Sequence, residues 1–254
     1  MAVMKGEGRN EVMFRNWSVP GRGDQFDAWL TQPDVDGRTG AVVVAHGIAG
    51  LTPSVKELGH AISRMGYACI VPDLYYRSGV EAGTEGIARV DVDAVFSDGR
   101  MLADLEDAVD FVTAGHGVDP DRVGVVGLGH GGRLAMLLAA RRPYRFRCLC
   151  AIDPVLGKVE LPDGSVRTRV ALEEAAAITC ATQVIVAGAG DNSDADEVER
   201  LATELDDRGQ VFTYPDAVSD FLDEDSDTFD ASLATDVFGR VIGLLDSTVG
   251  AHLT

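Results

Sequence analysis

The chain has 254 residues, 46% of them hydrophobic, and a formal net charge of −19 at pH 7. This length and composition favour one α/β domain spanning 1–254, with a core large enough to be stable without disulfide or metal cross-links. The acidic balance argues against a nucleic-acid or anionic-membrane partner, because basic surfaces bind phosphate groups. No stretch reaches the roughly 18 apolar residues of a membrane span, and no signal-like segment opens the chain, so we expect a cytoplasmic protein.

Apolar runs alternate with segments of helical periodicity, which is typical of βαβ units and a mostly parallel sheet of about eight strands with helices on both faces. An antiparallel hairpin is expected at the start, around the turn at 21–24. In chain order, the predicted elements are strands 12–19, 26–31 and 41–45, helix 54–65, strand 68–72, helix 101–113, strand 123–128, helix 130–141, strands 148–152 and 183–187, helix 194–208, strand 211–214 and helix 231–245. The segment Ser54-x-x-Glu57 predicts a capping box for the first helix.

Three stretches do not follow this alternation of predicted strands and helices. Residues 75–97 follow a strand end and mix glycines with acids, which indicates a lid or loop. Residues 157–182 contain a polar turn and then a helix-like run at 170–178. The acidic run 216–230 is expected to be a solvated loop.

The four cysteines lie mostly in apolar runs without metal-type spacing, so we expect no metal site. Cys148 and Cys150 are two residues apart on a predicted strand and therefore point to one face. We interpret them as reduced core side chains.

The segment V-G-V-V-G-L-G-H-G-G at 123–132 joins a predicted strand to a predicted helix through glycines. In a G-x-Nu-x-G elbow, the middle residue exposes a nucleophile at the top of the sheet. Here the middle residue is Gly129, which carries no oxygen or sulfur. The glycines also fit G-x-G-x-x-G, but that fingerprint belongs to a first βαβ unit, so we expect no dinucleotide and no other cofactor.

Four landmarks in order resemble the dienelactone hydrolase family of the α/β-hydrolase fold, and the resemblance covers about residues 10–247. They are A-H-G-I-A-G-L at 45–51, G-Y-A-C-I-V-P-D-L-Y at 66–75, G-L-G-H-G-G at 127–132, and the pair A-G-A-G-D at 187–191 with Y-P-D-A-V-S-D-F at 214–221. The resemblance implies ester or lactone hydrolysis by a Cys-His-Asp triad. It places the triad cysteine at Gly129, the histidine at Ser219 and the acid at Asp191. A glutamate that partners the thiol in founding members falls at Gly47.

Three of these four groups are therefore replaced together, while the backbone around them is expected to survive. By resemblance, the oxyanion hole is formed by the N–H groups of His130 and Ile48, and His130 also opens a helix, whose N-terminus favours negative charge. Such an anion-binding site suits a carboxylate, or an enolate formed beside a carbonyl. The predicted catalytic residues are His130, Asp191 and His46, and the predicted substrate-binding residues are Gly47, Ile48, Gly129, Tyr75, Arg77, Ser219 and Asp220.

Structural alternatives stay open for several of these side chains. His130 can be a hydrogen-bonded interior histidine, and His46 can serve only to order its loop. Asp191 can be a loop-ordering carboxylate, and Arg77 a surface arginine.

Three functions compete at this point. The first is a non-hydrolytic enzyme (a cyclase, dehydratase, isomerase or lyase) acting on a small carbonyl compound in the retained oxyanion hole. The second is a pseudoenzyme that binds a carbonyl or carboxylate ligand, or a partner, without chemistry. The third is a noncovalent ester or lactone hydrolase in which Asp191 or His130 activates water. The sequence leaves the oligomeric state open, a homo-oligomer included.

Overall fold

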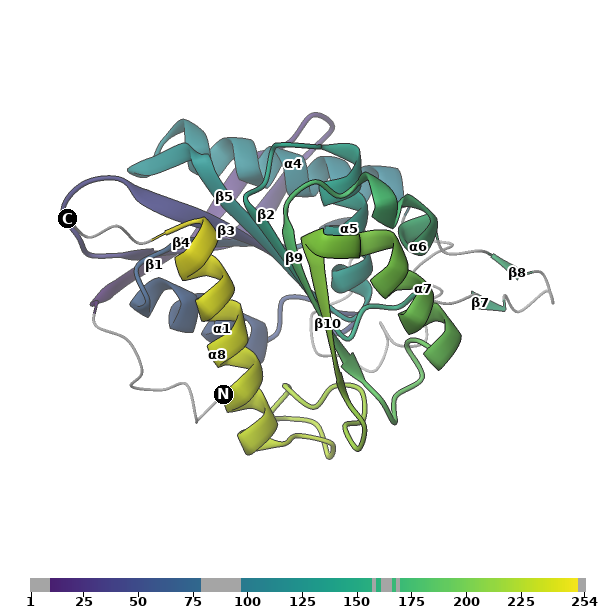
Figure 1. Ribbon diagram of the computed structural model, residues 1–254. Helices are drawn as coiled ribbons and strands as arrows, with labels where there is room; N and C mark the ends of the chain where they lie inside the picture. The colour runs from purple at the N-terminus through teal and green to yellow at the C-terminus, as the bar shows by residue number, and fades with distance from the viewer. Residues whose placement is uncertain (1–9, 79–96, 157–158, 161–165, 168–169, 251–254) are drawn as a thin grey trace.

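Eight of the apolar runs form one twisted sheet in the computed structural model, which describes residues 10–78, 97–156, 159–160, 166–167 and 170–250 (Figure 1). The strand order is β1-β2-β4-β3-β5-β6-β9-β10. β1 pairs antiparallel with β2, β2 pairs antiparallel with β4, and the remaining pairs are parallel. The strands are β1 Val12–Pro20, β2 Gln25–Pro33, β3 Thr39–Ala45, β4 Ala68–Pro72, β5 Val118–Leu128, β6 Cys148–Ile152, β9 Ala181–Ala187 and β10 Gly209–Tyr214. The predicted mostly parallel sheet and its opening hairpin are confirmed.

Helices cover both faces of this sheet, as predicted. The α-helices are α1 Pro53–Arg64, α4 Asp98–Ala114, α5 His130–Arg141, α6 Val170–Glu174, α7 Ala195–Leu205 and α8 Ala231–Thr248. Short 3-10 turns are η2 Tyr76–Ser78, η3 Ala175–Ala177 and η4 Asp206–Arg208, and two-residue strands β7 Val159–Glu160 and β8 Val166–Arg167 form a separate hairpin. None of the helices in the described part of the chain has both the length and the apolar composition to cross a membrane.

The core has two layers because successive side chains of a strand point to opposite faces. In β3, Val42 and Val44 belong to the buried cluster that includes residues of α1 and α8, whereas Ala41, Val43 and Ala45 belong to the cluster on the face of α4 and α5. Strands covered on both faces are expected to be almost continuously apolar, as β3 is. Figure 1 shows α1 and α8 on one side of the sheet and α4 on the other.

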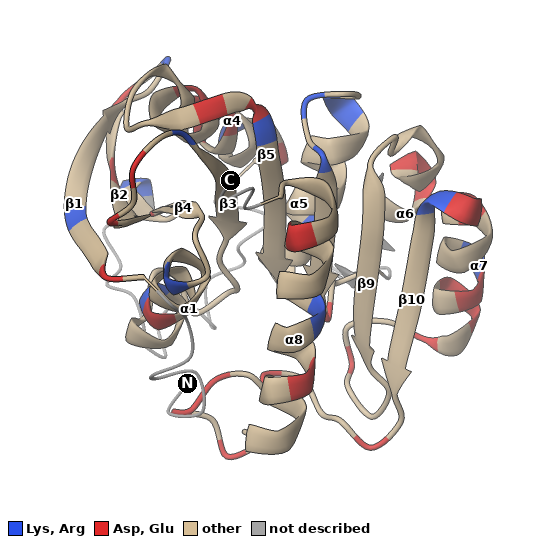
Figure 2. Cartoon of the chain, turned by 60° about the vertical axis from the view of Figure 1, so that its left-hand side comes forward, with Lys and Arg blue, Asp and Glu red and all other residues tan. Residues whose placement is uncertain are grey.

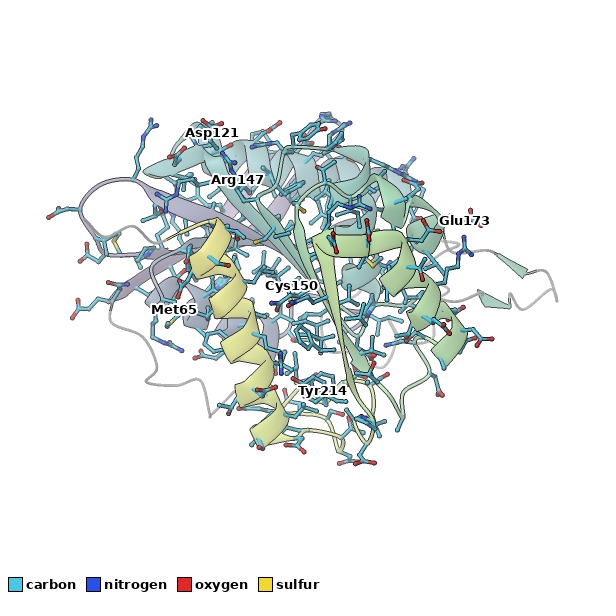
Figure 3. The ribbon with its side chains drawn as sticks, in the orientation of Figure 1. Met65, Asp121, Arg147, Cys150, Glu173 and Tyr214 are labelled. Carbon is cyan, nitrogen blue, oxygen red and sulfur yellow. The ribbon has the colours of Figure 1, made fainter. Side chains whose placement is uncertain are left out.

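All four cysteines are free and buried in this core. Cys148 and Cys150 both contribute to the layer under α1 and α8, which confirms their shared face, and Cys150 lies in the interior in Figure 3. Burial raises the pKa of the Cys148 thiol to about 12 and the pKa of Cys180 to about 11. These thiols are therefore protonated packing groups at neutral pH.

Element boundaries differ from the prediction where local signals compete. The expected capping box at Ser54 is wrong: Thr52 caps α1 by accepting a hydrogen bond from the Val55 N–H at 3.3 Å, with Pro53 at the first helical position. Ser54 is thereby left to donate to Asp223 on a distant loop, at 2.8 Å. β5 begins five residues before the predicted strand 123–128, across a segment whose proline and aspartates are typical of turns.

The irregular stretches are only partly described. Tyr75 and η2 belong to the predicted lid or loop at 75–97, whereas 79–96 lies outside the described residues. The run 216–230 forms an irregular connection between β10 and α8, as expected. Its acidic side chains are mostly at least partly exposed, but Phe221 within it is buried against α8 and the sheet.

Candidate active site

Gly129 forms the apex of the turn between β5 and α5, with φ 52° and ψ −115°. Its N–H donates to the Ile152 carbonyl at 2.8 Å, and its carbonyl accepts from the Arg133 N–H at 3.2 Å. A positive φ at a strand-to-helix turn matches the strained apex of an elbow. A Cβ added at Gly129 would meet no atom within 4 Å, so the apex faces open space.

The flanking glycines allow backbone to lie directly on backbone. A Cβ at Gly131 would collide with the carbonyl oxygens of Ala45 and His46, and a Cβ at Gly127 would lie 2.7 Å from the Gly131 carbonyl carbon. The start of α5 therefore rests on the carboxyl end of β3. This close approach brings the N-terminus of α5 beside the loop that follows β3.

A cavity of about 100 Å³ lies above this turn. Gly129 lines it together with three other residues that the sequence analysis had singled out, Gly47, Ile48 and Asp220. Most of the remaining walls are apolar, from Val55, Leu58, Leu128, Ile152, Phe221 and Leu222. The polar side chains among the lining residues are Thr52, Ser54, Asp153, Asp220 and Asp223, and no Lys, Arg or His is among them.

Asp153 is a buried carboxylate that holds the cavity floor together. It follows β6 in a left-handed conformation, with φ 46°. Its Oδ1 accepts from the Ala187 N–H at 3.1 Å, and its Oδ2 accepts from Asn192 Nδ2 at 2.6 Å. Asp153 thus ties the end of β6 to the end of β9 and to the loop that carries Asp191.

Asp220 and Asp223 lie together at the other side of the cavity. Asp220 is exposed at the rim, has φ 66°, and receives no hydrogen bond on its carboxyl group from the described residues. Desolvation raises the pKa of Asp220, and the charges of Asp223 and Asp153 raise it further. Asp223 accepts hydrogen bonds from Ser54 at 2.8 Å and from the Asp225 N–H at 3.2 Å, so its carboxylate is held in place.

His46 lies beneath the cavity and is fully buried. Its Nε2 accepts from the Leu74 N–H at 3.0 Å, so the ring proton is on Nδ1, which bonds the Gly47 carbonyl at 2.9 Å. Burial lowers the pKa of His46, which keeps the ring neutral. The edge of its ring packs against Tyr75, itself buried, at 4.8 Å between centroids. His46 therefore holds the start of the Gly47–Ile48 loop, and Tyr75 packs against the ring that does so.

The His130 side chain is buried, and it is not among the residues that line the cavity. Its neighbour in the next turn of α5, Arg133, pairs with Asp98 of α4 at 2.6 Å. Its backbone, as the first residue of α5, remains at the helix N-terminus beside Gly129.

The remaining predicted residues, Arg77, Asp191 and Ser219, are not among those that line the cavity. Arg77 makes a two-pronged ion pair with Asp104, at 2.6 and 3.2 Å, and stacks on Tyr76. Asp191 is exposed on the loop between β9 and α7. Ser219 packs against that loop, because a Cβ on Gly190 would lie 2.5 Å from its hydroxyl oxygen. The two loops expected to carry a triad acid and histidine are thus neighbours.

Two lining carboxylates were missed by the sequence analysis. Asp153 directly follows a predicted strand, at the carboxyl end of a parallel sheet where ligands bind, so this signal was available. Asp223 belongs to an acidic run that is typical of solvated loops, and only the contact with Ser54 on α1 brings it to the cavity. Within the described ranges, no three His, Cys, Asp or Glu side chains come together as metal ligands do.

The chain is similar in sequence to known proteins. The dienelactone hydrolase family model matches residues 26–249. A Yersinia pestis protein named "Putative carboxymethylenebutenolidase" is 25% identical over 232 residues, covering 89% of this chain and 85% of that protein. "Carboxymethylenebutenolidase 1" of Cupriavidus pinatubonensis is 34% identical over 125 residues, covering 47% of this chain and 53% of that protein.

A solved structure gives the same picture of the fold. The crystal structure of a "Putative Dienelactone Hydrolase" from Klebsiella pneumoniae superposes with a TM-score of 0.82 at 22% identity. It covers 93% of this chain and 99% of the other. The predicted α/β-hydrolase fold is therefore confirmed.

The contact between β3 and the elbow predicts a large effect of one methyl group. We expect Gly131→Ala to lower the free energy of unfolding by about 3 kcal/mol, because its Cβ would strike two carbonyl oxygens. Gly243→Ala is the matched control, since a Cβ there meets nothing within 4 Å inside α8, and it should stabilise by about 0.5–1 kcal/mol. Urea unfolding measures both, and equal effects would contradict the packing argument.

The raised pKa of Asp220 predicts that replacing its carboxyl group increases the stability of the fold, by an amount that depends on pH. A carboxyl group with a raised folded-state pKa destabilises the fold above that pKa, and the cost disappears below the unfolded value of about 3.9. We therefore expect Asp220→Asn to raise Tm at pH 7 and to leave it unchanged near pH 3. Asp225→Asn removes the same charge from the same loop, but Asp225 does not line the cavity. This control should raise Tm at pH 7 by less than Asp220→Asn does. A difference that grows as the pH falls would contradict the assignment.

Proposed function

The chain belongs to the dienelactone hydrolase family, and on that premise we propose that it is a non-hydrolytic enzyme acting on a small carbonyl compound. The reaction classes that fit are isomerisation, dehydration, cyclisation and carbon–carbon cleavage. Each of them proceeds through an enolate or a related oxyanion that this cavity is suited to stabilise.

The residues at the triad positions support a departure from hydrolysis. Acyl transfer through a covalent intermediate needs a nucleophile and a base within hydrogen-bond reach. The apex residue Gly129 carries no side chain, and Ser219 takes the place expected for the histidine. Without these two groups, Asp191 has no imidazole to orient.

The N-terminus of α5 supplies the carbonyl-polarising group in this proposal. Helix N-termini carry a partial positive charge and direct N–H groups outward, which favours a developing negative oxygen. α5 begins directly after Gly129, and Gly129 and Ile48 line the same cavity. A substrate carbonyl oxygen placed there would be stabilised as it gains charge.

Asp220 is the proton-transfer group that we assign. The observation that carries the proposal is that this carboxyl group lines one cavity with the elbow apex and has a raised pKa. A general acid–base works best when its pKa approaches the operating pH. His130 and Asp191 are less well placed, because neither side chain lines the cavity.

The charges of the lining residues narrow the substrate class. Asp153, Asp220 and Asp223 face the cavity, and the lining includes no cationic side chain. A carboxylate ligand would be repelled at such a site. The arrangement therefore favours an uncharged carbonyl compound over an acidic one.

Deuterium exchange tests the proposed role of Asp220. In D₂O with an unbiased metabolite mixture, we expect the native protein to exchange or convert at least one carbonyl compound, detected by mass spectrometry. Asp220→Asn should lower that rate by about 10²- to 10⁴-fold, the usual contribution of a general acid–base. Asp225→Asn, the control on the same loop, should retain it. Exchange that persists in Asp220→Asn would rule out the assigned role.

A ligand-binding pseudoenzyme is the second candidate. The mainly apolar walls and the structural hydrogen bonds of Asp153, Asp223 and His46 favour it. In that case ligands would protect the native protein against thermal unfolding, with neither exchange nor product in the metabolite mixture.

Restoring two side chains tests whether their replacement accounts for the loss of triad chemistry. We expect Gly129→Cys with Ser219→His to gain esterase activity with a burst phase, because the apex has room for a side chain and the loops of Asp191 and Ser219 adjoin. Either single variant should lack the burst. A double variant that folds but shows no esterase activity would mean that the cavity itself has diverged.

A further inference from the structure

β1 is an edge strand of the central sheet, and no described segment pairs with its outer side, which forms an open edge in this part of the structure. It is nine residues long, stands at one end of the strand order, and pairs among the described residues with β2 alone. Met13 and Phe14 on it are 59% and 60% exposed. Natural proteins usually shorten, charge or cover such edges, because unpaired N–H and C=O groups invite another strand.

The backbone groups that face this edge can be assigned. The Asp34 N–H donates to the Glu11 carbonyl at 2.8 Å, so Glu11 directs its backbone groups toward β2. In an antiparallel pair this direction alternates along the strand. The backbone N–H and C=O groups of Met13 and Arg15 therefore also point toward β2. Those of Val12 and Phe14 point toward the open edge.

We propose that β1 pairs antiparallel with β1 of a second copy of this chain, about a two-fold axis through Met13. In this register Glu11 faces Arg15 of the other copy, and Val12 faces Phe14, each twice because of the symmetry. Val12 and Phe14 are also the residues whose backbone N–H and C=O groups point outward. The register that pairs the opposite charges therefore also allows the backbone hydrogen bonds between the two copies. Met13 meets its own counterpart at the axis.

Other registers are poorer by the same criteria. An axis at Arg15 would place two arginines opposite each other, which is destabilising in an antiparallel pair. An axis at Phe14 would place Met13 opposite Arg15 and would leave Glu11 opposite Trp17. Only the axis at Met13 pairs both charges of the segment with opposite charges.

The distribution of charge also favours this edge over others. With a net charge of −19, most faces of two copies repel each other. The segment Glu11–Arg15 has no net charge, and Phe14 within it packs on Trp29 and His60 at centroid distances of 5.1 and 5.0 Å. Figure 2 shows β1 at one edge of the sheet and the acidic helix α7 beyond the other. A single strand pair is smaller than a standard interface, so the dimer should be weak and concentration-dependent.

Charge exchange tests the register. Sedimentation velocity over a concentration series should show a reversible dimer of the native chain. Arg15→Glu should raise its dissociation constant at least about tenfold, because two attractive pairs become repulsive. The double variant Glu11→Arg with Arg15→Glu should restore the native value. Arg200→Glu, the same charge change on α7 at the far side, should leave dimerisation unchanged.

A cross-link tests the axis independently. Opposed Cα atoms of a non-hydrogen-bonded antiparallel pair lie about 4.5 Å apart, within the range of a disulfide. Met13→Cys should therefore give a covalent dimer on mild oxidation, and Ser18→Cys on the same strand should not. The native cysteines are buried and add no background. A native chain that is monomeric at every concentration, a dimer insensitive to Arg15→Glu, or equal cross-linking of both cysteine variants would overturn the proposal.

Discussion

The contact of the β5–α5 turn with the end of β3 is the constraint on which the functional region depends. Side chains at Gly127 or Gly131 would occupy space already filled by backbone. Because these positions are glycine, α5 starts directly on the sheet, and Gly129 takes a positive φ at the top of the turn. The position of the helix N-terminus, the open space above the apex and the adjoining loop after β3 all follow from this one approach.

Around this backbone, residue types that are often catalytic serve to hold loops. His46 is neutral and bonds two backbone groups, which fixes the loop of Gly47 and Ile48. Arg77 and Arg133 pair with Asp104 and Asp98, so their charges are compensated where burial would be costly. A buried charged or imidazole group therefore indicates function only when its polar atoms face the cavity, and these do not.

The three carboxyl groups that line the cavity differ in how firmly they are held. The two carboxylate oxygens of Asp153 accept hydrogen bonds from the Ala187 N–H and from Asn192, and the carboxylate of Asp223 accepts one from Ser54. Asp220 differs from both, because it receives no hydrogen bond from the described residues and its pKa is raised by its surroundings. This difference between neighbouring aspartates, rather than any motif, is the basis of the proposed chemistry.

Periodicity and local chemistry in the sequence were sufficient for the fold: the apolar runs located every strand of the main sheet, and the glycines at 127–132 located the elbow. The resemblance to the family added four residues that line the cavity, Gly47, Ile48, Gly129 and Asp220, and these belong to segments that meet at one edge of the parallel sheet. The direction of side chains was decided only by tertiary packing. His130 is buried away from the cavity lining, and Asp223 lines the cavity while Ser54, from α1, donates to it. A linear pattern specifies which segments converge, but contacts between distant segments determine which polar atoms face the cavity and which are consumed in holding it together.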